Sequence, residues 1–259
     1  MLSASKIKLI HSLAHKKYRN ENGLFLAEGA KLVEELTRTF KCAFMAATEE
    51  WLSENRHPDI EQIQTVSQDE LRKASLLQTP HDVLALFHIP DNYCDINIAE
   101  TELCLALDGV QDPGNLGTIV RLADWFGVNH IFCSQETADV YNPKAIQATM
   151  GAIARVQLHY TDLYQSIRSL KDCVPTYGTF MNGQSIYSEN LSPNGLIIMG
   201  NEGNGISADI EKLVRFRIGI PSYPSGRPTS ESLNVAMATG IILSEFRRPQ
   251  ESPSPAFRH

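Results

Sequence analysis

Short apolar runs alternate with amphipathic segments along most of the chain. Apolar runs of about four to eight residues predict strands, whereas apolar residues at every third or fourth position predict helices. The last predicted helix covers residues 231–248, ESLNVAMATGIILSEFRR. One face of it is made of small and apolar residues: Leu233, Ala236, Met237, Gly240, Ile241 and Ser244. We expect this face to pack tightly against other parts of the protein.

Residues 1–92 have the pattern of a small α/β unit. Helices are predicted at 5–18, 30–38, 48–56 and 67–75, and strands at 23–29, 42–48, 60–66 and 82–90. Thr48 and Ser67 stand where helix caps are expected, and acidic residues follow each of them. The polar, turn-rich stretch 93–102 is the predicted linker to the rest of the chain.

Residues 103–248 alternate strands and helices more regularly. Strands are predicted at 103–110, 128–133, 154–160, 174–180, 195–200 and 216–221, with helices between them at 118–127, 143–151, 161–170 and 208–215. This alternation predicts a largely parallel sheet covered on both faces, so the predicted fold class is α/β. The remaining residues, 249–259, are rich in proline and serine and predict a mobile tail.

Charge and cysteine usage narrow the class of protein. The net charge is −7, yet residues 1–40 and residues 211–259 each carry 7 basic and 4 acidic side chains, which suits local contact with phosphates and a solvated surface equally well. The five cysteines are widely spaced and form no CxxC pair. This favours reduced thiols in a cytoplasmic protein over disulfides or a zinc site. No apolar run is long enough to predict a membrane span.

Three polar loops follow predicted strand ends. They cover residues 108–117, 200–205 and 221–232. Ligands of open α/β sheets bind beyond the carboxyl ends of the strands, so these loops together predict one binding site.

The first of these loops and the helix after it contribute Asn115 and Arg121 as candidate site residues. On this segment alone, Asn115 is equally well interpreted as a helix cap. Arg121 is equally well interpreted as an ion-pair partner of Asp108 or Asp124. The pattern by itself leaves both alternatives open.

The second and third loops add polar residues among glycines and serines. GNEGNGIS carries Glu202 as its only charge, and its glycines let backbone approach a ligand closely. The spacing does not match the GxGxxG dinucleotide fingerprint. Ser232 is a site candidate or a simple cap, whereas Asn234, in an apolar helix start, requires hydrogen-bond partners. Since no catalytic triad order or metal-ligand cluster accompanies them, these residues favour transfer of an activated group over hydrolysis.

Three ordered motifs resemble those of the SpoU (TrmH) family of RNA ribose 2′-O-methyltransferases, in the SPOUT superfamily. They are DGVQDPGNLGTIVRLADWFG, IIMGNEGNGIS and IP followed by ESLNVAMATGIIL. NPKAIQATMGAIARV, between the first two, is also similar to that family. KKYRNENGLFLAEGAKLVEEL resembles the ribosomal-protein L30e-like substrate-binding domain of its two-domain members. The resemblance covers nearly the whole chain.

This resemblance implies an L30e-like domain over residues 1–92 and a methyltransferase domain over residues 103–248 with a deep C-terminal trefoil knot. The closing helix would be the threaded element. The resemblance also implies a homodimer with sites beside its interface, RNA as the partner, and S-adenosylmethionine as methyl donor without a metal. The positions that match the family's donor-binding residues are Thr179, Gly200, Ile220 and Leu233.

Catalysis in the family is assigned to the positions of Asn115, Arg121, Glu202, Ser232 and Asn234. Because a guanidinium group is a poor general base, we expect Arg121 to clamp the ribose-phosphate and lower the pKa of the 2′-hydroxyl. The two asparagines and the serine would orient the ribose and donor, while Glu202 would hold its loop or Arg121. In-line placement of the hydroxyl and the sulfonium methyl would supply much of the rate.

Two positions depart from the family pattern. Ser222 replaces the usual methionine after IP, before a lengthened loop at 222–230, and His81-Asp82 replaces a usual Gln-Gly pair.

The resemblance as a whole predicts an S-adenosylmethionine-dependent RNA 2′-O-methyltransferase that acts on ribosomal RNA. Transfer RNA is the alternative substrate. A catalytically inactive RNA-binding member of the family and a nucleotide-dependent oxidoreductase are the alternative functions, and the failed fingerprint disfavours the oxidoreductase.

Overall fold

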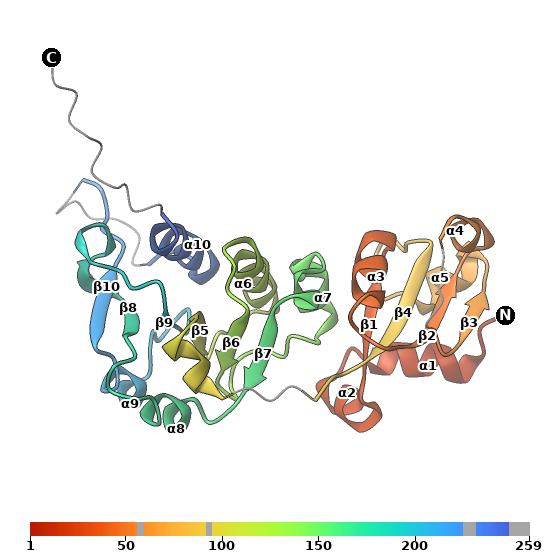
Figure 1. Cartoon of the computed structure of the whole chain (residues 1–259). Coiled ribbons are helices and arrows are strands. Elements are labelled where there is room, and N and C mark those ends of the chain that lie inside the picture. Colours follow the sequence, from red (N-terminus) through yellow and green to blue (C-terminus); the bar gives the residue numbers. More distant parts are fainter. Residues whose placement is uncertain (56–59, 92–94, 225–231, 249–259) are drawn as a thin grey trace, which may run out of the picture.

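The computed structural model describes residues 1–55, 60–91, 95–224 and 232–248 (Figure 1). It contains a four-stranded sheet in the N-terminal unit (residues 1–91) and a six-stranded sheet in the C-terminal unit (residues 95–248). The predicted tail at 249–259 and residues 225–230 of the lengthened loop lie outside the described residues.

The N-terminal unit is a mixed sheet packed with short helices. Its strand order is β1 (Leu24–Glu28), β4 (Val83–His88), β2 (Cys42–Ala47) and β3 (Ile63–Thr65). Strand β4 is antiparallel to β1 and β2, and β3 is parallel to β2. The helices are α1 (Ala4–Ser12), α2 (Lys16–Asn22), α3 (Ala30–Thr37), α4 (Glu49–Glu54) and α5 (Gln68–Ala74). The capping box expected at Ser67 is present in α5.

The prediction of a single helix at 5–18 is wrong, because the helix is interrupted between α1 and α2. At the break, the guanidinium group of Arg19 donates hydrogen bonds to the carbonyl oxygens of Leu13 (2.7 Å) and Ala14 (3.0 Å). These carbonyls are therefore satisfied by a side chain rather than by the next helical turn.

The C-terminal unit has the predicted parallel sheet. Its strand order is β10 (Phe216–Gly219), β8 (Thr176–Ser185), β9 (Gly195–Gly200), β5 (Leu103–Asp108), β6 (His130–Cys133) and β7 (Gln157–Tyr160). Every strand pair in it is parallel. The helices are α6 (Pro113–Trp125), α7 (Pro143–Thr149), α8 (Leu163–Arg168), α9 (Ala208–Glu211) and α10 (Val235–Phe246), with short 3-10 turns η1 (Ile96–Glu100), η2 (Ala152–Ala154) and η3 (Ile186–Ser188). Among the described residues, no helix is long and apolar enough to cross a membrane.

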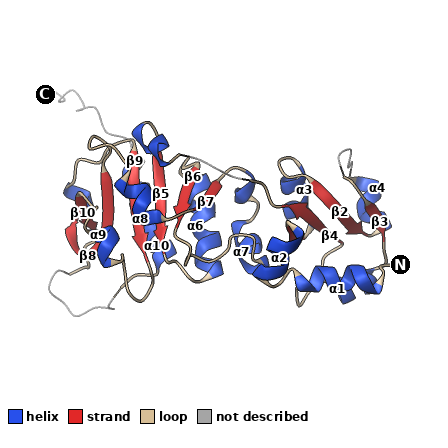
Figure 2. Ribbon diagram, turned by 90° about the horizontal axis from the view of Figure 1, so that it is seen from below, coloured by secondary structure: helices blue, strands red, loops and turns tan. Residues whose placement is uncertain are grey.

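Helices cover both faces of this sheet, as the alternation of elements predicts. Figures 1 and 2 show α6, α7 and α10 on one face and α8 and α9 on the other. On the first face, Leu105 and Ile197 belong to a core with residues of α6 and α10. On the second face, Ala106 and Ile198 pack with residues of α8 and α9. The α/β fold class is therefore confirmed. The predicted linker contributes to the second core through the buried Ile96 of η1.

The closing helix packs with a different face from the one that the sequence analysis proposed. The buried side chains of α10 are Val235, Ala236, Thr239, Ile242, Leu243 and Phe246. By contrast, Leu233 is 54% exposed and Met237 is 64% exposed. Both faces of this segment are apolar, so periodicity alone could not say which one meets the sheet. The helix also begins later than predicted, because Asn234 is its N-cap.

The two units share an interface that contains a buried ion pair. The Arg19 side chain of α2 donates from Nε (3.0 Å) and Nη2 (2.6 Å) to Oδ2 of Asp139 in the C-terminal unit. Arg19 is 1% exposed. Nearby, the rings of Phe25 and Tyr141 lie 4.9 Å apart, and Gln147 of α7 donates to the carbonyl oxygen of Glu28 (2.8 Å). The packing of α7 beside β1 therefore joins the units into one body (Figure 1).

We expect Arg19→Met to lower the free energy of unfolding by about 3–5 kcal/mol, because it removes a buried guanidinium group and leaves the Asp139 carboxylate, whose side chain is 12% exposed, without that partner. Urea titration followed by tryptophan fluorescence measures this. Lys17→Met is the matched control, since Lys17 pairs with Glu21 on the surface and its loss should cost less than about 1 kcal/mol. Equal stability of Arg19→Met and the control would contradict a structural role for the buried pair.

Candidate active site at the carboxyl ends of the strands

The site lies where the parallel strands β5 and β9 end side by side. Their last residues, Asp108 and Gly200, are register partners. The loops that leave these two strands therefore start next to each other, as expected for a ligand site in an open α/β sheet.

The loop after β9 folds back tightly on itself. The backbone groups of Asn201 and Gly205 exchange two hydrogen bonds of 2.9 Å. A Cβ on Gly200 would lie 2.2 Å from the carbonyl carbon of Gly205, so only glycine fits there. Oδ1 of Asn201 accepts from the backbone N–H groups of residues 203 (2.9 Å) and 204 (3.0 Å). Its Nδ2 donates to the carbonyl oxygen of Gly109 in the first loop (2.7 Å).

Helix α6 begins in the first loop with a charged cap. Asp112 is the N-cap, and its Oδ1 accepts the backbone N–H of Asn115 (2.8 Å). The ammonium group of Lys144, from α7, donates to Oδ2 of Asp112 (2.8 Å). This hydrogen bond and that from Asn115 hold the pKa of the Asp112 carboxyl below its usual value. Since Asp112 provides the cap, the interpretation of Asn115 as the cap is wrong, and its side chain remains available to the site.

A chain of hydrogen bonds links the three predicted loops. Nδ2 of Asn234 donates to Oδ1 of Asn115 (3.0 Å), and Nδ2 of Asn115 donates to Oε1 of Glu202 (3.0 Å). Oε2 of Glu202 also accepts the backbone N–H of Gln111 (3.3 Å). Oδ1 of Asn234 meanwhile accepts the N–H groups of residues 236 (3.0 Å) and 237 (3.2 Å) at the start of α10. The structure thus brings together three of the five predicted catalytic residues.

The other two predicted catalytic residues lie apart from this chain of hydrogen bonds. Ser232 is exposed and precedes the Asn234 cap, so the interpretation of Ser232 as the cap is wrong. Arg121 is exposed on α6 and forms no hydrogen bond or ion pair with any residue that the structure describes. It borders a cavity of about 360 Å³ with Thr118, Leu122, Trp125 and Phe126.

The alternative partners proposed for Arg121 are occupied elsewhere. Asp124 receives two hydrogen bonds from Arg155, of 2.8 and 2.9 Å. Oδ2 of Asp108 accepts the backbone N–H of Ser207 (2.7 Å). The structural ion-pair interpretation of Arg121 is therefore wrong, and its guanidinium group is free to meet a ligand.

Three of the four predicted donor-binding positions lie on or directly after the neighbouring strands β8, β9 and β10. Thr179 of β8 donates to the carbonyl oxygen of Ile198 (3.0 Å), Gly200 ends β9, and the half-buried Ile220 follows β10. The fourth position, Leu233, is more than half exposed just before α10. Apolar side chains and closely folded backbone suit the adenine ring of S-adenosylmethionine. Among the described residues no cluster of potential metal ligands occurs.

Three residues that organise this site were missed by the sequence analysis as site residues. Asp112 had a local signal, because Asp-Pro is typical of an N-cap followed by proline in the first turn. Asn201 sits in a glycine-rich turn, where side-chain to backbone bonds are common. Lys144 gave no signal, because its partner is 32 residues away in the chain.

Comparison with known proteins identifies the family. The model of the SpoU rRNA Methylase family matches residues 102–244, and that of the MRM3-like substrate binding domain matches residues 4–85. The 23S rRNA (guanosine(2553)-2′-O)-methyltransferase RlmP of Bacillus subtilis is 31% identical over 248 residues, covering 93% of this chain and 96% of the relative.

Solved structures agree with this assignment. A protein of Porphyromonas gingivalis assigned to the TrmH family of RNA methyltransferases superposes with a TM-score of 0.86 at 38% identity, covering 96% of this chain and 99% of the other. An S-adenosylmethionine-bound rRNA methyltransferase of Sinorhizobium meliloti superposes with a TM-score of 0.80 at 27% identity, covering 96% and 97%. The family resemblance found in the motifs is thus confirmed, and the chain belongs to the SpoU rRNA methylase family.

Proposed function

We propose that this protein transfers the methyl group of S-adenosylmethionine to the 2′-hydroxyl of a ribose in ribosomal RNA. The single observation that carries the proposal is the hydrogen-bonded chain of Asn234, Asn115 and Glu202 at the strand ends of a SpoU domain. Two further findings support it: the relative RlmP is named for this reaction on 23S rRNA, and a solved neighbour is an rRNA methyltransferase bound to S-adenosylmethionine.

The chemistry requires orientation and charge more than a nucleophile on the protein. When bound, S-adenosylmethionine supplies an electrophilic methyl group on a sulfonium. In the hydrogen-bonded chain, both amide groups are held by fixed partners, so Asn115 and Asn234 present defined polar atoms to the ribose. Because these amide groups are already fixed, less entropy is lost when the ribose 2′-hydroxyl is brought in line with the methyl group. Glu202 anchors Asn115 and the backbone of Gln111, and is thereby a positioning residue.

Arg121 supplies the positive charge that the hydrogen-bonded chain lacks. Its guanidinium group is exposed beside the cavity on α6 and is free of described partners. Contact with the ribose-phosphate would stabilise the oxyanion that develops as the 2′-hydroxyl loses its proton. The exposed Ser232 is proposed to help orient the substrate from the segment before α10.

The N-terminal unit is proposed to bind the RNA substrate. Its match to a substrate-binding domain over residues 4–85 supports this role. We propose residues 1–92 as the L30e-like domain, 93–102 as the connection, and 103–248 as the methyltransferase domain. A mobile tail at 249–259 remains part of the proposal.

We also propose that the C-terminal segment forms the knot of the family. Close backbone packing at the edge of the sheet supports it. A Cβ on Gly183 would lie 2.3 Å from the carbonyl carbon of Ile218, and one on Gly219 would lie 2.5 Å from the carbonyl oxygen of Phe180. These glycines let the paired strands β8 and β10 approach at backbone distance where their register shifts.

A homodimer is proposed from the apolar surface that α6 and α10 leave uncovered. Trp125 is 83% exposed, and Met237 and Leu233 are each more than half exposed. Apolar area of this kind, at the junction of two helices that pack together, marks an interaction surface. Arg121 lies one turn before Trp125 on α6, so a partner docked there would border the site. A cytoplasmic location is proposed because Cys42, Cys104 and Cys133 are buried free thiols.

We expect Asn115→Ala and Arg121→Ala each to lower kcat/KM for ribose methylation by at least about 100-fold, since each removes a group that orients or stabilises the developing oxyanion. Transfer of radiolabelled methyl from S-adenosylmethionine to ribosomal RNA, with nuclease digestion to locate the label on the ribose, measures this. Label on a base would overturn the proposed chemistry.

The matched control for these variants is Asn129→Ala. Like Asn115, Asn129 donates to a glutamate, Glu102 (3.3 Å), but it is exposed and precedes β6 at the opposite end of the strands. We expect wild-type activity from it. The same assay with transfer RNA tests the alternative substrate, and absence of both methyl transfer and S-adenosylmethionine binding in calorimetry would favour the inactive RNA-binding member.

We expect Trp125→Glu to convert the homodimer to a monomer, because a charge placed in an apolar interface is not compensated. Sedimentation velocity at micromolar concentration measures the change. Tyr187→Glu is the control, since Tyr187 is 51% exposed but lies outside α6 and α10. A wild-type protein that sediments as a monomer at these concentrations would contradict the proposed dimer.

A further inference from the structure

The open edge of the six-stranded sheet carries an exposed aromatic ring between two arginines. Strand β10 is the terminal strand next to β8, and its first residues read Phe216-Arg217 after Arg215. Phe216 is 44% exposed, although its ring stacks on the buried Tyr177 at a centroid distance of 5.1 Å. One face of the Phe216 ring is therefore fixed by the core, and the rest of the ring is accessible.

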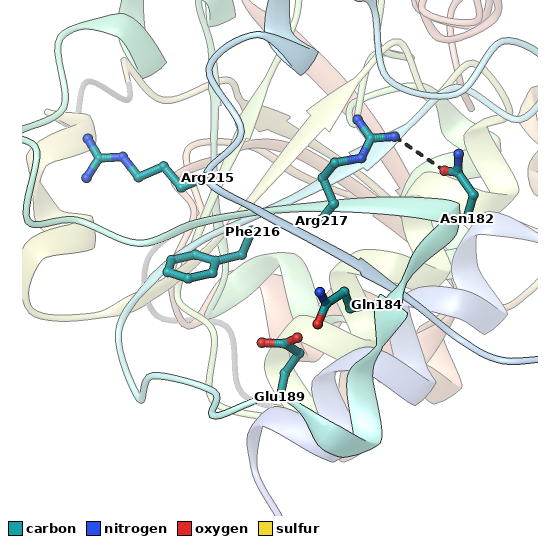
Figure 3. A pocket seen from close by; sticks show the side chains of 6 residues that line it. All are labelled: Asn182, Gln184, Glu189, Arg215, Phe216 and Arg217. Carbon is teal, nitrogen blue, oxygen red and sulfur yellow. Dashed lines mark hydrogen bonds between the residues drawn. The ribbon is translucent and has the colours of Figure 1, made fainter.

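The Phe216 ring lines a cavity of about 400 Å³. It is lined by Asn182, Gln184, Glu189, Arg215, Phe216 and Arg217 (Figure 3). This volume lies within the range of about 300–1,000 Å³ that is usual for small-ligand sites. The amides and the carboxylate offer both hydrogen-bond donors and acceptors next to the aromatic surface. Stacking beside mixed donors and acceptors is the chemistry that proteins use for an unpaired nucleobase.

The edge strand divides these groups between its two sides. Figure 3 shows Phe216, Gln184 and Glu189 on one side of β10, and the Arg217 side chain on the other. This follows from the alternation of side chains along a strand. Because none of the described residues pairs with β10 on the side away from β8, a ligand can reach both sides around the open edge.

The charge of the segment suits a phosphate. Residues 212–217, KLVRFR, carry three basic and no acidic side chains in a chain whose net charge is −7. Arg217 stacks on the Phe180 ring (3.6 Å from Cζ to the centroid) and pairs with Glu211, so its position is fixed. Arg215 pairs with the fully exposed Asp172 at 3.1 Å. Such a surface pair is weak, so an RNA phosphate can replace the carboxylate.

We propose that this edge is a binding site for one unpaired nucleotide of the substrate RNA, outside the nucleotide that is methylated. The base stacks on the open part of Phe216 and bonds to Gln184 and Glu189, while its phosphate reaches around β10 to Arg215. The inference rests on the proposed function, since it takes the RNA substrate as the ligand. It adds a contact on the side of the C-terminal unit opposite the N-terminal unit (Figure 1).

The test compares Phe216→Leu with Phe216→Tyr in the full-length protein. Leucine keeps the apolar contact with Tyr177 but removes the aromatic face, and tyrosine keeps both. The probe is a fluorescein-labelled single-stranded RNA of about 12 nucleotides and random sequence, titrated by fluorescence anisotropy. We expect Phe216→Leu to weaken binding by about tenfold and Phe216→Tyr by less than about twofold. Unchanged thermal midpoints and unchanged binding of S-adenosylmethionine show that both variants are folded.

A second pair of variants tests the phosphate contact. Arg215→Gln should weaken binding and reduce the slope of log affinity against log salt by about one. Arg168→Gln, an exposed arginine of α8 that does not line the cavity, should leave both unchanged. Photo-cross-linking of RNA that contains 4-thiouridine should label the peptide around residue 216 and lose that label in Phe216→Leu.

Binding of Phe216→Leu as tight as that of the wild type, or cross-links only outside residues 182–217, would overturn the inference. That failure is distinct from failure of the proposed function, because methyl transfer by the wild type is measured separately. If the wild type methylates ribose and Phe216→Leu binds normally, only the edge site is lost. If no ribose is methylated, the proposed reaction is lost, and the RNA affinities still report on the edge site.

Discussion

The hydrogen-bonded chain of Asn234, Asn115 and Glu202 is the interaction on which the site depends. Its members come from the loop after β9 and from the starts of α6 and α10, as much as 119 residues apart in the chain, so it requires the sheet and the docked α10. The Asn234 amide bonds both to the start of α10 and to Asn115, whereas the Asn115 amide bonds to Asn234 on one side and to Glu202 on the other. A residue that holds both sides of a junction rigidly is also well placed to orient a small substrate group.

The sheet makes this junction possible because all its strands run in the same direction. Parallel strands deliver their carboxyl ends to one edge, and the loops that leave β5 and β9 start from register partners. Close backbone packing then restricts the loop after β9 to a tight turn. Gly200 cannot carry a side chain against Gly205, and the turn is closed by the backbone bonds of Asn201. The polar side chains of the site therefore project from strand ends and helix starts, and the packing of the hydrophobic core fixes the positions of these strands and helices.

The two units are joined by polar contacts that are unusually well satisfied for an interface between domains. The buried guanidinium group of Arg19 has four hydrogen bonds, to Asp139 and to two carbonyl oxygens. Arg155 connects Glu35 of the N-terminal unit to Asp124 on α6, the helix that carries Arg121. These contacts fix α6, and Arg121 on it, relative to the N-terminal unit.

Read alone, the amino-acid sequence is enough to predict the α/β class, most of the order of strands and helices, the family, and three polar loops at strand ends. These features follow from local periodicity and from short motifs that need no knowledge of packing. Packing in three dimensions is needed to know which apolar face of α10 is buried, where the first helix ends, and which residue caps each helix at the site. Packing also pairs Asp112 with Lys144. It places Arg155 against Asp124, so Asp124 does not pair with Arg121. Side chains choose partners by distance in space, and a one-dimensional pattern contains no such distances.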